Sequence, residues 1–143
     1  MPVATFNKFQ AFVEHLAEKV HNLGSDTLKI LLTNDAPSAA SDAVRADLTS
    51  ELSTGNGYTA GGATVTIAGS SQTGGTYSLV GNDVTITAAG GPVGPFRYCC
   101  LYNDTPTSPA DPLIAYYDYG SSVTLADGES LTIDFGSSIL TLA

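Results

Sequence analysis

The sequence predicts a mainly β fold, a β-sandwich of jelly-roll-like topology with an N-terminal amphipathic α-helix. Short runs of Val, Ile, Leu, Tyr and Phe recur from residue 27 onward, and glycines, of which the chain has 15, punctuate them. A chain of 143 residues fits one domain. We therefore expect one domain over 1–143, with the helix in 1–24, the β body in 25–143, and a short helix or ordered loop near 39–52.

The N-terminal segment has the pattern of a helix that packs on one side. Thr5 is a candidate N-cap and Gly24 a candidate C-terminal stop. Apolar residues recur between them at spacings of three and four, namely Phe6, Phe9, Val13, Leu16, Val20 and Leu23. Phe12 widens this apolar side. Such a helix must dock, either on the protein's own sheet or on another subunit, so Phe6, Phe9 and Phe12 are candidate interaction residues.

The β body is expected to contain eight or nine strands. They are predicted at residues 27–34, 76–80, 83–87, 96–102, 113–119, 123–125, 131–135 and 139–142, with further strands and loops in 54–78. Gly81-Asn82 and Asp127-Gly128 are turn signals, so the strands that flank each pair are predicted to form hairpins. The strands at 96–102 and 113–119 are continuously apolar or aromatic, which predicts central positions for both.

The charge balance excludes some partners. The chain carries five Lys and Arg against fourteen Asp and Glu, a net charge of −9 at pH 7. Beyond residue 50, Arg97 is the only basic residue. Because this surface repels phosphate, we expect no nucleic-acid partner. We also expect no membrane partner, because no apolar run approaches the roughly 18 residues of a membrane span and no secretory signal is present. The protein should be made in the cytoplasm.

No pattern of catalytic, cofactor-binding or metal-binding residues is found. Glu18 and His21 have a spacing used in di-metal helices, but the second copy that such a site needs is missing. We interpret His15 and His21 as solvated residues on the polar side of the helix. Cys99 and Cys100 should point to opposite faces of a strand and are interpreted as buried or nearly buried core residues. The sequence therefore predicts a protein that is not an enzyme and needs no cofactor.

Two polar features lie inside the apolar strands. Arg97 needs a carboxylate partner if it is buried, and Asp118 is the candidate. Five tyrosines lie on the same two strands, namely Tyr98, Tyr102, Tyr116, Tyr117 and Tyr119. They either fill a wide core or form part of a subunit interface, where tyrosine is enriched. In the second case, Tyr116 and Tyr117 are candidate interaction residues.

Three segments resemble one group of tailed-bacteriophage virion proteins. They are FNKFQAFVEHLAEKVHNLGSDTLKILLTN (6–34), GPFRYCCLYNDT (94–105) and DYGSSVTLADGESLTIDF (118–135). We associate this group with capsid decoration, or cement, proteins. The resemblance spans nearly the whole chain and implies a β-sandwich or jelly-roll body that binds the outside of the expanded head. It brings no catalytic residues.

This resemblance implies a protein of the capsid exterior that stabilises the shell by bridging subunits. The implied partners are the phage major capsid protein and further copies of the chain, in a homodimer or homotrimer. We expect the segment 2–23 to contribute an intersubunit or capsid contact. One alternative is a phage tail or head-fibre protein that binds a host surface. Another is a carbohydrate-active enzyme with Asp118, Asp127 and Glu129 as paired acids, although two of these lie on a turn.

Overall fold

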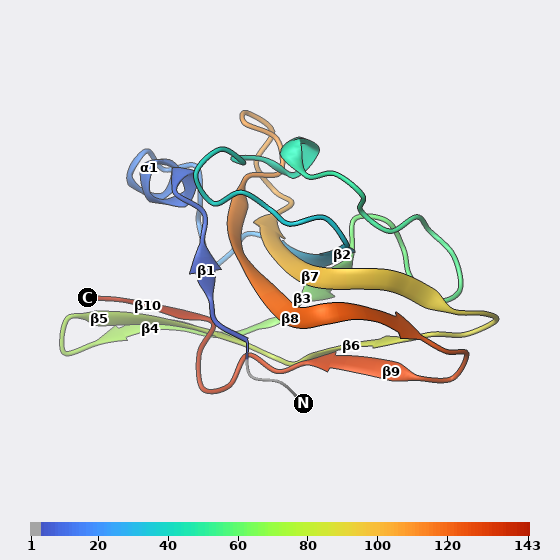
Figure 1. The fold of residues 1–143 in the computed structure, drawn as a ribbon. Coiled ribbons are helices and arrows are strands. Elements are labelled where there is room, and N and C mark those ends of the chain that lie inside the picture. Colours follow the sequence, from blue (N-terminus) through green and yellow to red (C-terminus); the bar gives the residue numbers. More distant parts are fainter. Residues whose placement is uncertain (1–3) are drawn as a thin grey trace.

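The computed structural model describes residues 4–143, so the start of the expected contact segment at 2–23 lies outside the described residues. The fold is mainly β, with 47% of residues in strands and 7% in helices, which confirms the mainly β part of the prediction. Figure 1 shows two layers, with a five-stranded sheet above a three-stranded and a two-stranded sheet. No helix within residues 4–143 is long and apolar enough to span a membrane.

The five-stranded sheet is antiparallel and has the order β1-β8-β7-β2-β3. Its strands are β1 (Asn7–Lys8), β2 (Leu28–Thr33), β3 (Ala63–Val65), β7 (Val93–Asn103) and β8 (Leu113–Leu125). β7 and β8 are the longest strands, and each lies between two neighbours, as their apolar and aromatic content predicts. The predicted strand at 27–34 is also confirmed, as β2. These three strands form the centre of the sheet.

The second layer consists of two smaller antiparallel sheets with the orders β10-β5-β4 and β6-β9. Their strands are β4 (Ile67–Thr73), β5 (Thr76–Gly81), β6 (Val84–Thr87), β9 (Ser130–Ile133) and β10 (Leu140–Leu142). Both predicted hairpins are wrong, because β5 pairs with β4 and β10, β8 pairs with β7, and β6 pairs with β9. The tight hairpin is β4–β5, where Gly74 and Gly75 have φ values of 60° and 86°, as a type I′ turn requires.

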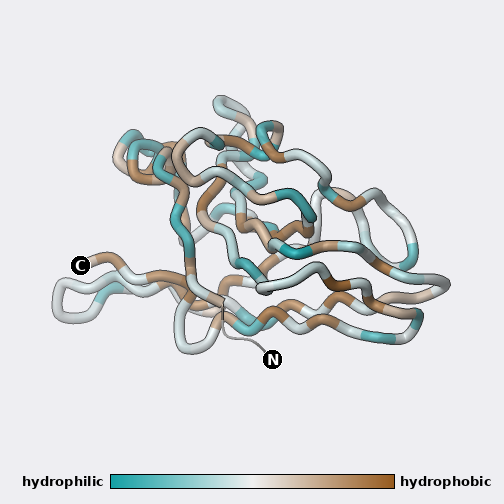
Figure 2. The backbone as a smooth tube through the Cα atoms, viewed as in Figure 1, coloured by the Kyte–Doolittle hydropathy of each residue, from teal (hydrophilic) through white to brown (hydrophobic). Residues whose placement is uncertain are grey.

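The main hydrophobic core fills the space between the layers. Leu28, Ile30 and Leu32 of β2 and Phe96 of β7 contribute to it from above, and Leu79 of β5 from below, all with no exposed surface. Figure 2 shows the corresponding alternation of hydrophobic and polar residues along the lower strands. This alternation, with a period of two, directs one face of each strand inward.

A second, smaller cluster lies on the opposite face of the five-stranded sheet. Its buried members are Phe9, Leu31, Cys100, Tyr102 and Leu113. Cys100 belongs to this cluster and Cys99 to the main core, as the alternation of a strand predicts. The middle of β7 is therefore buried on both faces.

Residues 34–57 form a loop that packs on this second cluster through Leu48. The short helix predicted near 39–52 is limited to one 3₁₀ turn, η1 (Arg45–Asp47). Arg45 donates two hydrogen bonds to Glu51, and its guanidinium lies 5.6 Å from the ring centre of Tyr102. These contacts fix the loop on the sheet, because a charged pair with a stacked guanidinium has little rotational freedom.

Within the described residues 4–24 the N-terminal segment is α-helical only in α1 (Ala11–Ala17), so the helix predicted over 1–24 is wrong in length. β1 pairs with β8, and the N–H of Phe9 donates to the carbonyl of Ile114 at 3.1 Å before the helix begins. After the helix, Lys19 has a φ of 67°, which is incompatible with an α-helix. Pairing with an open sheet edge thus overrides the local helical pattern.

Candidate interaction surface

A β-bulge in β7 turns two side chains to the outer face of the five-stranded sheet. The register between β7 and β8 shifts between Phe96 and Tyr98. Phe96 and Cys99 both face the main core. Regular alternation allows only one outward residue between two inward ones, whereas the bulge allows Arg97 and Tyr98 to share the outer face.

Arg97 and Asp118 form a two-point ion pair across β7 and β8. The distances are 2.8 Å from Nε to Oδ1 and 3.0 Å from Nη2 to Oδ2. Oδ1 of Asp118 also accepts the N–H of Gly120 at 2.8 Å. The hydrogen bonds from Arg97 lower the pKa of Asp118, and Asp118 raises the pKa of Arg97. Both groups stay charged, and the pair, whose side chains are 39% and 37% exposed, is accessible to a partner.

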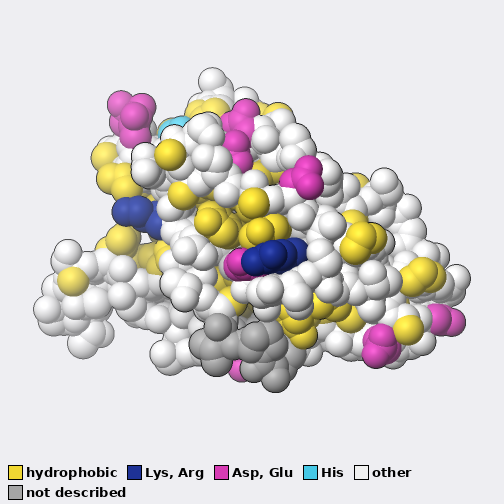
Figure 3. Space-filling model, in the orientation of Figure 1, with side chains coloured by type: hydrophobic (Ala, Val, Ile, Leu, Met, Phe, Trp, Pro, Cys, Tyr) yellow, Lys and Arg dark blue, Asp and Glu magenta, His cyan; other side chains and the backbone are white. Residues whose placement is uncertain are grey.

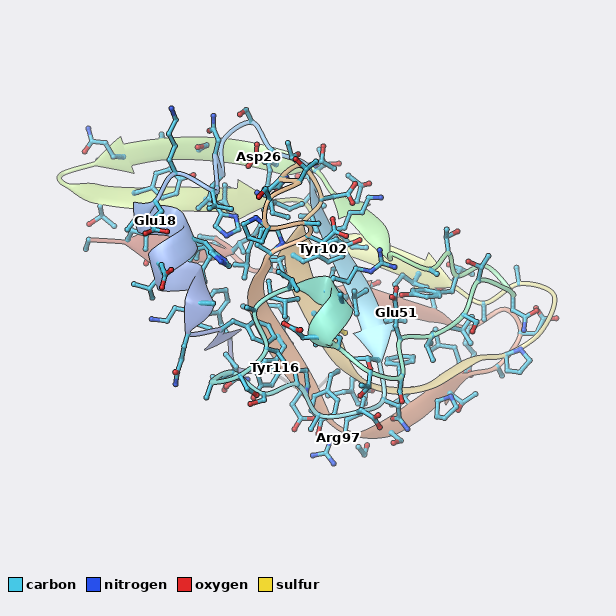
Figure 4. All side chains as sticks on the ribbon, turned by 90° about the horizontal axis from the view of Figure 1, so that it is seen from above. Glu18, Asp26, Glu51, Arg97, Tyr102 and Tyr116 are labelled. Carbon is cyan, nitrogen blue, oxygen red and sulfur yellow. The ribbon has the colours of Figure 1, made fainter. Side chains whose placement is uncertain are left out.

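Tyr98, which is only 9% exposed, and the half-buried Tyr116 complete this surface. Their ring centres lie 6.2 Å apart in an edge-on arrangement, and the guanidinium of Arg97 lies 5.4 Å from the ring centre of Tyr98. The ring of Phe9 packs against the ring of Tyr116, with 5.5 Å between their centres. Figure 3 shows a basic and an acidic side chain together among hydrophobic ones over β7 and β8, and Figure 4 shows Arg97 extending outward. We call Arg97, Tyr98, Tyr116 and Asp118 the Arg97–Tyr116 surface.

This arrangement is suited to binding another macromolecule. Tyrosine and arginine are enriched at the energetic centres of protein interfaces, because each offers a large contact area together with hydrogen-bonding groups. Ring contacts and the ion pair already restrict the side chains of the Arg97–Tyr116 surface. Binding through it therefore loses little side-chain entropy.

The other predicted interaction residues serve the chain's own core. Phe9 and Phe12 are 0% and 2% exposed, so both dock on the protein's own sheet. Phe6 and Tyr117 are half-buried, and their rings meet edge-on at 6.0 Å beside the main core. Tyr116 instead packs against the second cluster. Tyr116 and Tyr117 thus point to opposite faces of β8 and do not share one surface.

Of the side chains that could take part in catalysis, the two cysteines are buried, and the carboxylates accept hydrogen bonds from the chain itself. Burial raises the pKa of the Cys99 thiol to about 12 and also raises that of Cys100, so both remain neutral thiols. Asp127 and Glu129 each accept a hydrogen bond from a nearby backbone N–H. In the part of the chain that the structure describes, no three His, Cys, Asp or Glu side chains gather into a group that could hold a metal ion.

His21 is placed differently from the sequence prediction. It is 6% exposed rather than solvated, and its ring packs against Phe12 at 5.2 Å between centres. Its Nδ1 lies 3.1 Å from Nδ2 of Asn103. The other amide atom, Oδ1 of Asn103, accepts the N–H of Thr105, so Nδ2 is the donor and Nδ1 of His21 the acceptor. The imidazole is therefore neutral, with its proton on Nε2.

The surroundings of His21 keep its imidazole neutral down to a pH well below the ordinary pKa of histidine. Burial, and next the electrostatic interaction with His15, lower the pKa of His21 to about 4, while the interaction with Asp26 raises it. The ring centres of His15 and His21 lie 6.1 Å apart. The helical periodicity gave no signal of this burial, because it assumed a helix that in fact ends at Ala17.

The Arg97–Tyr116 surface remains the strongest functional candidate. The sequence identified the pairing of Arg97 with Asp118 and the tyrosine-rich strands. It missed the contribution of Tyr98, because a bulge leaves no signature in residue spacing. No protein-family model, curated protein or solved structure matches this chain.

Proposed function

We propose that this chain is a structural protein of a tailed-bacteriophage virion that decorates the capsid exterior and stabilises it by bridging major capsid subunits. The resemblance of segments 6–34, 94–105 and 118–135 supports the phage setting. In this proposal the two layers form a β-sandwich of jelly-roll-like topology. The protein acts as a homodimer or homotrimer and without catalysis or cofactors.

The observation that carries the binding role is the Arg97–Tyr116 surface on the two longest strands. A protein that holds shell subunits together needs a stiff contact surface, and these strands are held by neighbours on both sides. Many copies on one lattice supply avidity, so each contact can be modest in area. The excess of acidic side chains, a net charge of −9, faces solvent or basic patches of the shell.

Binding of the purified chain to expanded phage heads that lack it tests this proposal. Wild-type protein should sediment with the heads. Tyr116→Ala and Arg97→Ala should each weaken binding about tenfold or more, because truncation of a hot-spot residue costs about 2 kcal/mol or more. Thr85→Ala is the matched control, because Thr85 is exposed on β6 in the other layer. It should bind like the wild type.

The copy number per virion separates this proposal from its alternative. Hundreds of copies, counted by quantitative mass spectrometry of purified virions, indicate a shell component. A few dozen or fewer, with binding to host cells and not to heads, would assign the chain to the tail or a fibre and overturn the capsid role. Head binding that is unchanged in both surface variants would refute the role of the Arg97–Tyr116 surface.

A further inference from the structure

The β4–β5 hairpin forms an arm with one open edge. In the three-stranded sheet of the described structure, β4 is the terminal strand and pairs only with β5. A cleft of about 550 Å³ lies between the arm and residues 16–26. Figure 1 shows the arm extending sideways from the two layers. Within the described residues no strand pairs with the outer edge of β4, and Gly24 lies against the side chain of Ser70 in the middle of the strand.

This edge lacks the features that usually prevent strand pairing between molecules. Such edges are commonly short, or carry charged residues or proline. β4 is seven residues long, and residues 52–82 contain no Asp, Glu, Lys, Arg or Pro. Its only bulge lies near the base of the arm, between Ile67 and Gly69, so Gly69–Thr73 keep a regular register. By contrast, β1 and β3, at the edges of the large sheet, have two and three residues.

The register of the hairpin defines which backbone groups are free. Thr73 and Thr76 flank the two-residue Gly-Gly turn and so exchange backbone hydrogen bonds with each other. Because the direction of N–H and C=O groups alternates along a strand, Ser71 also points its groups toward β5. Ser70 and Gln72 then direct theirs to the open edge. A second strand that lies antiparallel beside β4 would satisfy these groups.

We propose that two copies of this chain pair through β4, antiparallel and about a two-fold axis at Ser71, to form a continuous six-stranded sheet. With this axis Ser71 lies opposite its own symmetry mate, and Ser70 lies opposite Gln72 of the second copy. The pair at Ser71 is a non-hydrogen-bonded one, in which the side chains approach most closely. The two pairs beside it supply the inter-strand hydrogen bonds.

The absence of charged residues from 52–82 makes this edge the most favourable place for a second copy to bind. Two molecules that each carry −9 repel one another, so they associate best where carboxylates are absent. A two-fold contact also brings the same short segment of both copies together, so any charge in it would meet a like charge. The Ser, Gly, Gln and Thr residues of β4 carry no charge and avoid this repulsion. The arm is held in shape by a 2.8 Å hydrogen bond between the hydroxyls of Ser70 and Tyr77. Little ordering is therefore needed on pairing.

Light scattering coupled to size exclusion, on the full chain, tests this pairing. The wild type should be a dimer. Ser71→Glu and Ser71→Lys should each be monomeric, because each places like charges opposite one another. An equal mixture of the two variants should again form dimers, which neither misfolding nor a general change of charge explains. Thr85→Glu, at an exposed position outside the arm, should stay dimeric.

A single cysteine at the axis gives an independent readout. Ser71→Cys should form a disulfide-linked dimer under mild oxidation, whereas Cys99 and Cys100 are buried and should remain reduced. A wild type that is monomeric at every soluble concentration would overturn the proposal. So would dimers that survive both charge variants, or a mixture that stays monomeric. This inference deepens the homodimer of the proposed function, and no capsid is present in these assays. A monomeric result therefore overturns the pairing and the homodimer, whereas capsid decoration itself fails only if the chain does not bind expanded heads.

Discussion

Replacing His21 by Gln should flatten the pH dependence of stability between pH 6.5 and 4. An unfolded chain protonates this histidine near its ordinary pKa of 6.5, whereas the folded chain does so only near 4. Between these values the unfolded state binds the extra proton, so acid lowers the free energy of unfolding. A shift of this size, at about 1.4 kcal/mol per pKa unit, corresponds to about 3 kcal/mol lost on acidification. Below pH 4 the loss from His21 is complete.

The carboxyl groups with shifted pKa values are the same in both proteins. Asp35, Asp47 and Asp118 have lowered pKa values, so their stabilising contribution is present above their ordinary pKa of 3.8 and is lost at lower pH. Asp111 has a raised pKa from burial, but it is unchanged by the substitution. The difference between wild type and variant therefore isolates His21.

Urea unfolding followed by far-ultraviolet circular dichroism at a series of pH values measures this effect. The wild type should lose about 3 kcal/mol more than His21→Gln between pH 7 and 4. A smaller stability of the variant at pH 7 is expected from lost packing and does not affect the comparison of slopes. His15→Gln should keep the larger part of the slope, which comes from burial of His21, and lose the smaller part that comes from the interaction with His15. Equal slopes in the wild type and His21→Gln would refute the assignment of a neutral, buried imidazole.

Three further substitutions and one chemical treatment test the packing of the protein. Gly62→Ala should lower the free energy of unfolding in urea by about 3 kcal/mol or more, because φ is +82° and the new Cβ would collide with the backbone of β2. Gly74→Ala is the control: at φ +60° and in open space, it should lower this free energy by only about 1 kcal/mol. Glu51→Ala should lower the free energy of unfolding by about 2 kcal/mol, because it leaves the donors of Arg45, Tyr58 and Gly61 without their carboxylate partner. An unchanged unfolding midpoint would contradict this. Cys99 and Cys100 should react with a thiol reagent only after denaturation, as monitored by absorbance, and rapid labelling of the native protein would show that they are accessible.

Local pattern was sufficient for several features of this protein. The strands β2, β7 and β8 were predicted because continuous apolar content marks strands that are buried on both faces. The opposite directions of Cys99 and Cys100 follow from strand alternation alone. The pairing of Arg97 with Asp118 was predicted because an arginine in an apolar strand needs a carboxylate partner if it is buried, and Asp118 lies on the other aromatic strand. In each case the decisive physical effect acts within a few residues or through overall composition.

The tertiary structure alone decided which strands pair and where the N-terminal helix ends. Turn signals at Gly81-Asn82 and Asp127-Gly128 mark reversals correctly, yet the strands beside them belong to different sheets. Hydrogen bonds to β8 and the left-handed backbone at Lys19 shorten the helix and bring His21 into the interior. These outcomes depend on contacts between residues far apart in the chain. The free energies of such contacts outweigh local propensity, and they cannot be inferred from a short segment of sequence.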